Sequence, residues 1–157
     1  QEENIVTGFV AKTKEEAIRK LAGVLVKSHQ LNVDRDALTR AVLGREDEVS
    51  TCLGGGLAIP HGEVSGISHM YGVMAISQPG LPFETPDGQP VHCVVLLATP
   101  PGERQRHLEV LAALARTVGT DSDVQRRLYA ARSPAHAYDI LHEEEAVHFN
   151  YFLDEST

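Results

Sequence analysis

The chain has 157 residues, of which 42% are hydrophobic and 23% charged, and this size and composition suit one globular domain with its own core. Its formal net charge of −8 argues against a nucleic acid or an anionic membrane surface as a partner. The longest apolar runs are far too short to cross a bilayer, so we expect no membrane insertion.

Two amphipathic helices are expected near the start of the chain. The first begins after Thr13, which has capping-box spacing to Glu16, and an apolar stripe follows on one face. The second begins after Asp34, a typical N-cap residue, and turns Leu38 and Val42 inward. Each helix therefore has one face to bury against other elements.

Short apolar segments rich in β-forming residues occupy the middle of the chain. Residues 57–60, 70–77 and 91–100 have this character and are bounded by glycine or proline. Residues 91–98 form a nearly continuous apolar run, which is typical of a strand covered on both faces.

Helical periodicity returns in the last third of the chain. Apolar residues recur with helical spacing over residues 107–118, and shorter helices are expected over residues 121–131 and 133–145. In the last of these, Ser133 is a good N-cap and Pro134 takes the favoured first helical position. Helices on either side of a run of strands predict an α/β domain, a sheet with helices on both faces.

His61 is the first candidate functional residue. It follows a short apolar strand and Pro60, so it is expected at the mouth of the sheet, where open α/β sheets bind ligands. Four glycines within residues 54–62 would let backbone N–H groups approach an anion closely. The ordinary alternative is a histidine with a packing role only. No Lys-Ser or Lys-Thr follows the glycines, so this is not a nucleotide-binding P-loop.

His107 and Arg45 are the second and third candidates. His107 lies in the first turn of the helix expected over residues 107–118, where the amide dipoles favour an anion. Arg45 precedes the glycine-rich stretch and could hold a phosphate bidentately. Their ordinary alternatives are a helix-end core histidine and a solvated arginine.

Other constellations have less support. His69 and His92 could join His61 in a metal site, but none of the three shows the i, i+4 spacing of zinc ligands on a helix. Ser65 does not lie in a Gly-x-Ser-x-Gly elbow, which argues against a hydrolase.

The two cysteines, Cys52 and Cys93, form neither a disulfide framework nor a metal-binding spacing. A reducing compartment, the cytoplasm, is therefore expected, and a disulfide between the two is the less favoured alternative.

Two segments of the chain hold several short motifs in a fixed order. Residues 45–62, REDEVSTCLGGGLAIPHG, contain an Arg-Glu pair, a Ser-Thr pair and a Gly-x-Gly-x-Ala-x-Pro-His stretch. Residues 87–116 contain a Pro-Val strand, a proline after that strand and a His-Leu pair that opens the next helix. Together the two segments resemble the fructose/mannitol-type (type 2) EIIA domain of the bacterial phosphoenolpyruvate-dependent sugar phosphotransferase system, a group that includes the nitrogen-regulatory EIIA proteins. The resemblance covers roughly residues 5–144.

The resemblance implies a mixed central sheet of about five strands with helices on both faces, in one phosphocarrier domain over residues 1–145. It implies that His61 is phosphorylated, that His107 orients the imidazole and stabilises the phosphoryl group, and that Arg45 adds positive charge. It implies no metal ion and no cofactor. The aromatic-rich segment 146–157 is not part of the family pattern, and we expect a tail of unknown role there.

The leading functional hypothesis is a phosphocarrier that accepts a phosphoryl group from a phosphorylated HPr-like protein on His61 and passes it to an EIIB partner in sugar uptake. The alternative is a nitrogen-type regulator whose phosphorylation state controls a kinase, a transporter or a transcription regulator. A metal-binding or hydrolytic protein using His61 and His107 is the third hypothesis. A homodimer and fusion to other domains remain open.

Overall fold

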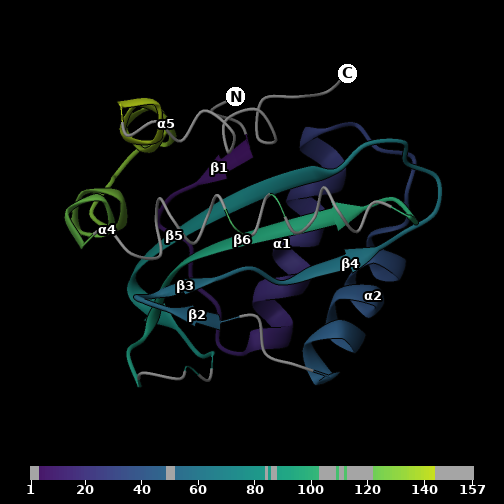
Figure 1. Cartoon of the computed structure of the whole chain (residues 1–157), viewed down its shortest axis with the longest axis horizontal. Helices are drawn as coiled ribbons and strands as arrows, with labels where there is room; N and C mark the ends of the chain where they lie inside the picture. Colours follow the sequence, from purple (N-terminus) through teal and green to yellow (C-terminus); the bar gives the residue numbers. More distant parts are fainter. Residues whose placement is uncertain are drawn as a thin grey trace.

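Helices from both ends of the chain enclose a central run of strands (Figure 1). The computed structural model describes residues 4–48, 52–83, 85, 88–102, 109, 112 and 122–143. The helices bounded within these ranges are α1 (Lys14–Ser28), α2 (Arg35–Glu48), α4 (Ser122–Tyr129) and α5 (Pro134–Glu143). The strands are β1 (Ile5–Val6), β2 (Cys52–Gly54), β3 (Leu57–Ala58), β4 (His61–Glu63), β5 (Tyr71–Leu81) and β6 (Val91–Thr99).

The strands form one mixed sheet in the order β1-β5-β6-β3-β2, and β4 also pairs with β6. Strand β6 runs antiparallel to β5 and parallel to β3 and β4. Because β3 pairs with Cys93 and Val94 while β4 pairs with residues 97–99, these two short strands lie end to end along the same side of β6. The sheet is therefore five strands wide, as predicted.

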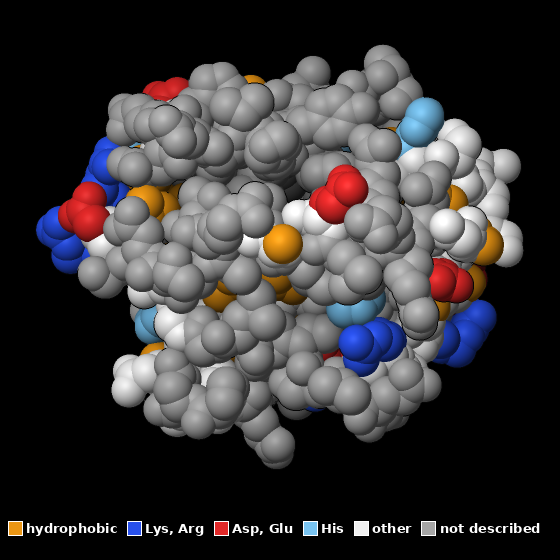
Figure 2. All heavy atoms as spheres, viewed as in Figure 1, with side chains coloured by type: hydrophobic (Ala, Val, Ile, Leu, Met, Phe, Trp, Pro, Cys, Tyr) orange, Lys and Arg blue, Asp and Glu red, His pale blue; other side chains and the backbone are white. Residues whose placement is uncertain are grey.

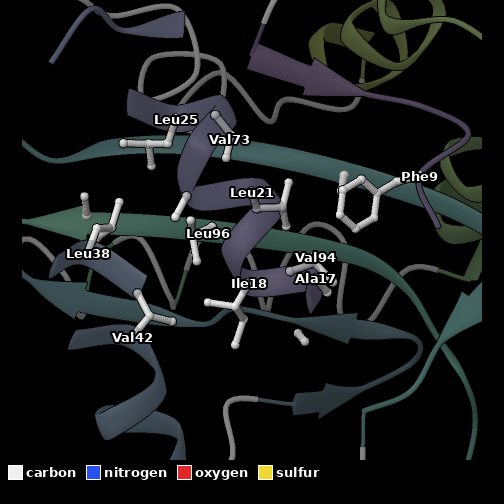
Figure 3. Close-up of a cluster of buried hydrophobic side chains, with 14 of the residues drawn as sticks. Phe9, Ala17, Ile18, Leu21, Leu25, Leu38, Val42, Val73, Val94 and Leu96 are labelled. Atoms are coloured by element: carbon white, nitrogen blue, oxygen red, sulfur yellow. The ribbon is translucent and has the colours of Figure 1, made fainter. Parts of the chain in front are cut away.

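Apolar side chains cover both faces of β6. On one face, Val94 and Leu96 pack with α1 and α2 in the cluster shown in Figure 3. On the other, Val95 and Leu97 pack with residues of α4 and α5. The prediction of helices on both faces is thus confirmed within the described part of the chain. Cys93 belongs to the second cluster as a free thiol, and its burial raises the thiol pKa to about 12.

The predicted helix starts are confirmed by their hydrogen bonds. Thr13 Oγ1 accepts from the N–H of Glu16 at 3.0 Å, and Ser133 Oγ accepts from the N–H of His136 at 3.1 Å. The Glu16 carboxylate accepts from the N–H of Lys12 at 2.7 Å, so the capping box closes one residue earlier than its usual form. Asp34 caps α2 through the N–H of Ala37 at 3.3 Å.

Two sequence predictions fall outside the described residues. The helix expected over residues 107–118, with His107 in its first turn, is described only at residues 109 and 112. The tail at residues 146–157 is not described. Among the helices that are bounded, none has the length and apolar character needed to cross a membrane.

Helix α2 approaches strand β4 more closely than side chains would ordinarily permit. A Cβ atom at Gly62 would lie 2.8 Å from the backbone nitrogen of Val42 and 3.1 Å from the Cβ of Ala41. The absence of a side chain at Gly62 therefore sets the distance between α2 and β4, and it seats one face of α2 beside His61.

Among the described side chains, two ion pairs connect α1 with α2. Lys14 Nζ lies 3.4 Å from the Glu46 carboxylate, whose side chain is fully buried. Arg19 lies 3.9 Å from Asp36 near the other end of α2, and both of these side chains are more than half exposed. The two pairs therefore differ mainly in burial.

We expect Gly62→Ala to lower the free energy of unfolding by about 1–3 kcal/mol, because the added methyl group must push the α2 backbone away from β4. Gly44→Ala is the matched control, since Gly44 lies in α2 and a methyl group added to it would have no neighbouring atom within 4 Å. In a helix interior this change stabilises by a few tenths of a kcal/mol up to about 1 kcal/mol. Urea denaturation of both variants checks this, and equal effects would contradict the close-packing explanation.

We expect Lys14→Met to destabilise the fold by about 1–3 kcal/mol, because it removes a cation that pairs with the buried Glu46 carboxylate. Arg19→Met removes the same charge from the same helix but breaks an exposed pair, so its effect should stay within about 0.5 kcal/mol. Thermal and chemical denaturation measure both. If Arg19→Met lowered the free energy of unfolding more than Lys14→Met, burial would not be what determines the contribution of each ion pair to stability.

Candidate functional site

His61 is the first residue of β4. It follows a two-residue break, Ile59 and Pro60, that separates β4 from β3 along the same side of β6. Pro60 has no N–H to give to a ladder, but its carbonyl accepts a hydrogen bond from Leu97 N–H at 3.1 Å. At the other end of β4, Val64 N–H donates to the Thr99 carbonyl at 2.9 Å. Backbone bonds to β6 thus hold His61 from both sides, and its side chain is 5% exposed.

The His61 ring has a defined tautomer. Its Nδ1 lies 2.9 Å from the carbonyl oxygen of Ile59. A carbonyl oxygen only accepts hydrogen bonds, so Nδ1 carries the proton and Nε2 carries the lone pair of the neutral ring. The Ile59 carbonyl, at the break between β3 and β4, thereby orients the imidazole and leaves the lone pair on Nε2.

The surroundings of His61 keep the ring neutral. Burial lowers the His61 pKa below its usual range, and this is the largest influence. The Ile59 carbonyl raises the pKa, the Arg45 guanidinium lowers it, and the Glu46 carboxylate raises it by a smaller amount than these. At neutral pH the side chain is therefore an uncharged imidazole near a cation, which can attack an electrophile and stabilise the anionic group that it receives.

Arg45 reaches this site from α2. It follows Ala41 by four residues and Val42 by three, so it lies on the same face of the helix that rests on Gly62. Its side chain is half-buried, and its charge influences the His61 ring. Two of the three sequence-predicted residues, His61 and Arg45, are therefore brought together by β4 and α2.

The third predicted residue, His107, lies outside the described residues. Its proposed position beside His61 remains a prediction.

Glu46 is a site residue that the sequence interpretation missed. It is 4% exposed, continues the buried row of Leu38 and Val42 at i, i+4 and i+8, and acts on the His61 ring through its charge. The sequence could have indicated this residue, because Glu46 continues an apolar stripe of α2. A carboxylate that is buried in such a position needs a polar or charged partner. Lys14 provides one at 3.4 Å.

The prediction that the glycine run surrounds a ligand at His61 is wrong for Gly55 and Gly56. Both have positive φ values and turn the chain between β2 and β3. The Gly56 carbonyl bonds to the N–H of Cys93, whereas His61 pairs with Leu97, four residues along β6 and about 13 Å away. Gly62 does lie at the site, but its open side is filled by α2.

The other histidines do not assemble around His61. His69 is exposed and contacts the ring of Tyr71, with centroids 6.3 Å apart. His92 lies near the opposite end of β6. Within the described ranges no group of three or more His, Cys, Asp or Glu residues could hold a metal ion.

Comparison with known proteins identifies relatives of two kinds. The chain is 34% identical over 135 residues to the fructose-specific EIIABC component of the phosphotransferase system (PTS) from Bacillus subtilis. The alignment covers 86% of this chain and 21% of that protein. It is also 34% identical over 140 residues to a nitrogen regulatory protein of Bradyrhizobium diazoefficiens, covering 88% of this chain and 89% of that protein. The chain thus spans about a fifth of the first relative and most of the second.

Solved structures share the fold. The nitrogen regulatory protein IIA-Ntr from Neisseria meningitidis superposes with a TM-score of 0.81 at 26% identity, covering 90% of this chain and 94% of that one. The mannitol enzyme IIA from Escherichia coli, solved in complex with phosphorylated enzyme IIB, gives a TM-score of 0.75 at 28% identity, covering 90% and 95%.

Residues 1–144 match the family model described as "Phosphoenolpyruvate-dependent sugar phosphotransferase system, EIIA 2". This match spans nearly the whole chain and agrees with the resemblance found in the sequence and with the shared fold. The chain belongs to the EIIA 2 family of the phosphoenolpyruvate-dependent sugar phosphotransferase system.

Proposed function

We propose that this protein is a phosphocarrier that receives a phosphoryl group on Nε2 of His61 from a phosphorylated HPr-like protein and passes it to an EIIB partner. The observation that carries the proposal is the 2.9 Å hydrogen bond from Nδ1–H of His61 to the Ile59 carbonyl. It leaves the lone pair on Nε2 of a buried, neutral ring beside Arg45. Family membership supports the same role.

The proposed transfer needs no proton movement at His61. The Nε2 lone pair attacks the phosphorus of the donor phosphohistidine in line, the donor N–P bond breaks, and the donor imidazole leaves with that electron pair. Nδ1 keeps its proton throughout, and the Ile59 carbonyl stabilises the positive charge that develops on the ring. Arg45 and the predicted neighbour His107 would hold the phosphoryl oxygens.

The onward acceptor is proposed from the relatives. The mannitol enzyme IIA of Escherichia coli was solved with phosphorylated enzyme IIB, and this supports an EIIB thiolate as the acceptor here. In that step the thiolate attacks the phosphorus and His61 regains the lone pair on Nε2. Exchange with donors and acceptors of this kind supports a cytoplasmic location.

A regulatory function is the second candidate, because relatives of both kinds match at the same identity. A Bradyrhizobium nitrogen regulatory protein and a Bacillus fructose-specific component are each 34% identical to this chain. In the regulatory case His61 is phosphorylated in the same way, but a target protein reads the phosphorylation state. Phosphoryl transfer to a panel of EIIB domains separates the two functions, since only the carrier loses its phosphate to a cognate EIIB.

We expect incubation with phosphoenolpyruvate, Enzyme I and HPr to add one acid-labile phosphate per chain, and His61→Gln to abolish it because the nucleophilic nitrogen is gone. Intact-mass spectrometry under alkaline conditions measures the addition. His136→Gln is the matched control, since that side chain is exposed on α5, and it should be phosphorylated like the unmodified chain. Full phosphorylation of the His61 variant would refute the assignment of the acceptor.

We expect the rate of phosphoryl acceptance to stay level as pH falls through about 6.5, the usual histidine pKa, and to decline only at lower pH. The reason is the lowered pKa of His61, which keeps the ring neutral where a solvated histidine would already be protonated. NMR titration of the His61 ring, together with quenched-flow rates between pH 5 and 8, provides the measurement.

Arg45→Met should raise the His61 pKa, because a nearby positive charge is removed, and it should slow acceptance by roughly tenfold to a hundredfold. Arg40→Met serves as the control, since Arg40 lies on α2 with an exposed side chain. An unchanged rate and an unchanged His61 pKa in Arg45→Met would remove Arg45 from the site.

A further inference from the structure

A second candidate site lies at the end of β6 opposite to His61. A cleft of about 320 Å³ opens there between the β2–β3 turn, the start of β6 and helix α4. This volume is near the lower limit of small-molecule pockets, which span roughly 300–1,000 Å³. The proposed phosphocarrier function does not use this cleft.

The backbone of β6 is irregular where it borders the cleft. The N–H groups of His92 and Cys93 both donate to the Gly56 carbonyl, at 2.8 and 3.0 Å. The register of the β5–β6 pair also shifts between Ile76 and Leu81. Irregularities of this kind change the direction of a side chain, and here His92 is placed against Tyr129, with ring centroids 5.6 Å apart.

His92 presents an acceptor to the cleft. Its Nδ1 lies 2.8 Å from the Ser77 carbonyl, so Nδ1 carries the proton and Nε2 carries the lone pair of the neutral ring. The described residues offer this Nε2 no hydrogen-bond partner. It can therefore accept a hydrogen bond from a ligand hydroxyl group.

The ring of Tyr129 forms a fixed apolar wall. Its hydroxyl donates to the Gly55 carbonyl at 2.7 Å, and burial raises the Tyr129 pKa, which keeps that hydroxyl protonated. A Cβ atom at Gly56 would lie only 3.0 Å from the ring, so the glycine lets the wall pack against the turn. Pro90 lines the cleft near this ring, and the two offer surface for the C–H groups of a ligand.

Charged and polar groups complete the cleft. Arg126 lines it from α4, a helix over which Lys or Arg and Asp or Glu side chains gather at the left edge of Figure 2. Arg126 pairs with Asp123, and because this pair is exposed it contributes little to stability and can give way to a ligand anion. The amide side chains of Gln89 and Gln125 also line the cleft, and such planar amides both donate to and accept from hydroxyl groups.

We propose that this cleft binds a small hydroxylated organic anion. The anionic group would pair with Arg126, a hydroxyl would donate to Nε2 of His92, and the carbon skeleton would lie against Tyr129 and Pro90. Sugar phosphates and sugar acids share this chemistry, and the test below distinguishes them.

The test is a two-dimensional NMR titration of the full chain, in which the His92 and His61 ring resonances are followed separately. The probes are fructose 1-phosphate, gluconate, fructose and inorganic phosphate. The proposal expects saturable shifts at His92 with fructose 1-phosphate or gluconate, and the tighter of the two identifies the anionic group. Fructose has the hydroxyl groups and the carbon skeleton without the anionic group, and inorganic phosphate has the anionic charge without the carbon skeleton. Each should therefore bind at least about tenfold more weakly.

Arg126→Gln should weaken binding of the tighter probe by roughly tenfold or more, because a charge-assisted contact to an anion is lost. Arg132→Gln is the matched control, since Arg132 is exposed, carries the same charge and does not line the cleft. His92→Gln, which removes the ring but keeps a polar side chain, provides a second variant, and circular dichroism verifies that each variant is folded.

Three results would overturn the proposal. The first is the absence of any shift at His92 with all four probes. The second is inorganic phosphate binding as tightly as fructose 1-phosphate, which would show that hydroxyl groups are not recognised. The third is equal weakening by Arg126→Gln and Arg132→Gln. Because the readout is binding at His92, these results are independent of phosphorylation at His61.

Discussion

The close approach of helix α2 to strand β4 at Gly62 is the contact on which the site depends. With no side chain between them, the backbone of Ala41 and Val42 rests directly on the strand that begins with His61. The next turn of α2 then carries Arg45 and Glu46 to the imidazole, and Lys14 of α1 neutralises the buried carboxylate. Strand β6 fixes the position of β4, and with it the position of His61, through backbone hydrogen bonds.

Two histidines, His61 in β4 and His92 in β6, have their ring orientation and tautomer fixed by a single backbone hydrogen bond. In His61 and His92 alike, Nδ1–H donates to a backbone carbonyl, that of Ile59 at 2.9 Å and that of Ser77 at 2.8 Å. The difference lies in their surroundings. His61 is buried near an arginine and a glutamate, whereas His92 is half-buried on an open cleft. The same hydrogen bond thus orients the ring of the proposed phosphoryl acceptor and the ring at the proposed recognition site.

The sequence predicts those features that depend on local chemistry. The N-caps at Thr13 and Asp34 and the doubly covered strand β6 follow from residue types and spacing, and the structure contains them. The sequence also proposes His61 and Arg45 as site residues, largely through the family resemblance of the segment that holds both, and the structure places them near each other.

Features that depend on tertiary contacts cannot be predicted in this way. The role of Gly62 arises from a helix that is close in space, and a glycine run gives no sign of which of its members meets a neighbour. Composition alone assigns Gly55 and Gly56 to ligand binding, because flexible turns and anion loops have the same composition. Glu46 resembles an ordinary surface charge in the sequence, since its burial and its pairing with Lys14 arise only when α1 and α2 pack together.

The hydrogen bond from His61 to the Ile59 carbonyl also bears on how partner proteins could meet this site. In the proposed phosphoryl transfer the proton stays on Nδ1 while the phosphoryl group arrives and departs, so no water molecule is needed to take up or return that proton. The exchange can therefore be completed inside an interface from which solvent has been expelled. In such an interface, hydrolysis, the main side reaction of a phosphohistidine, lacks its second reactant.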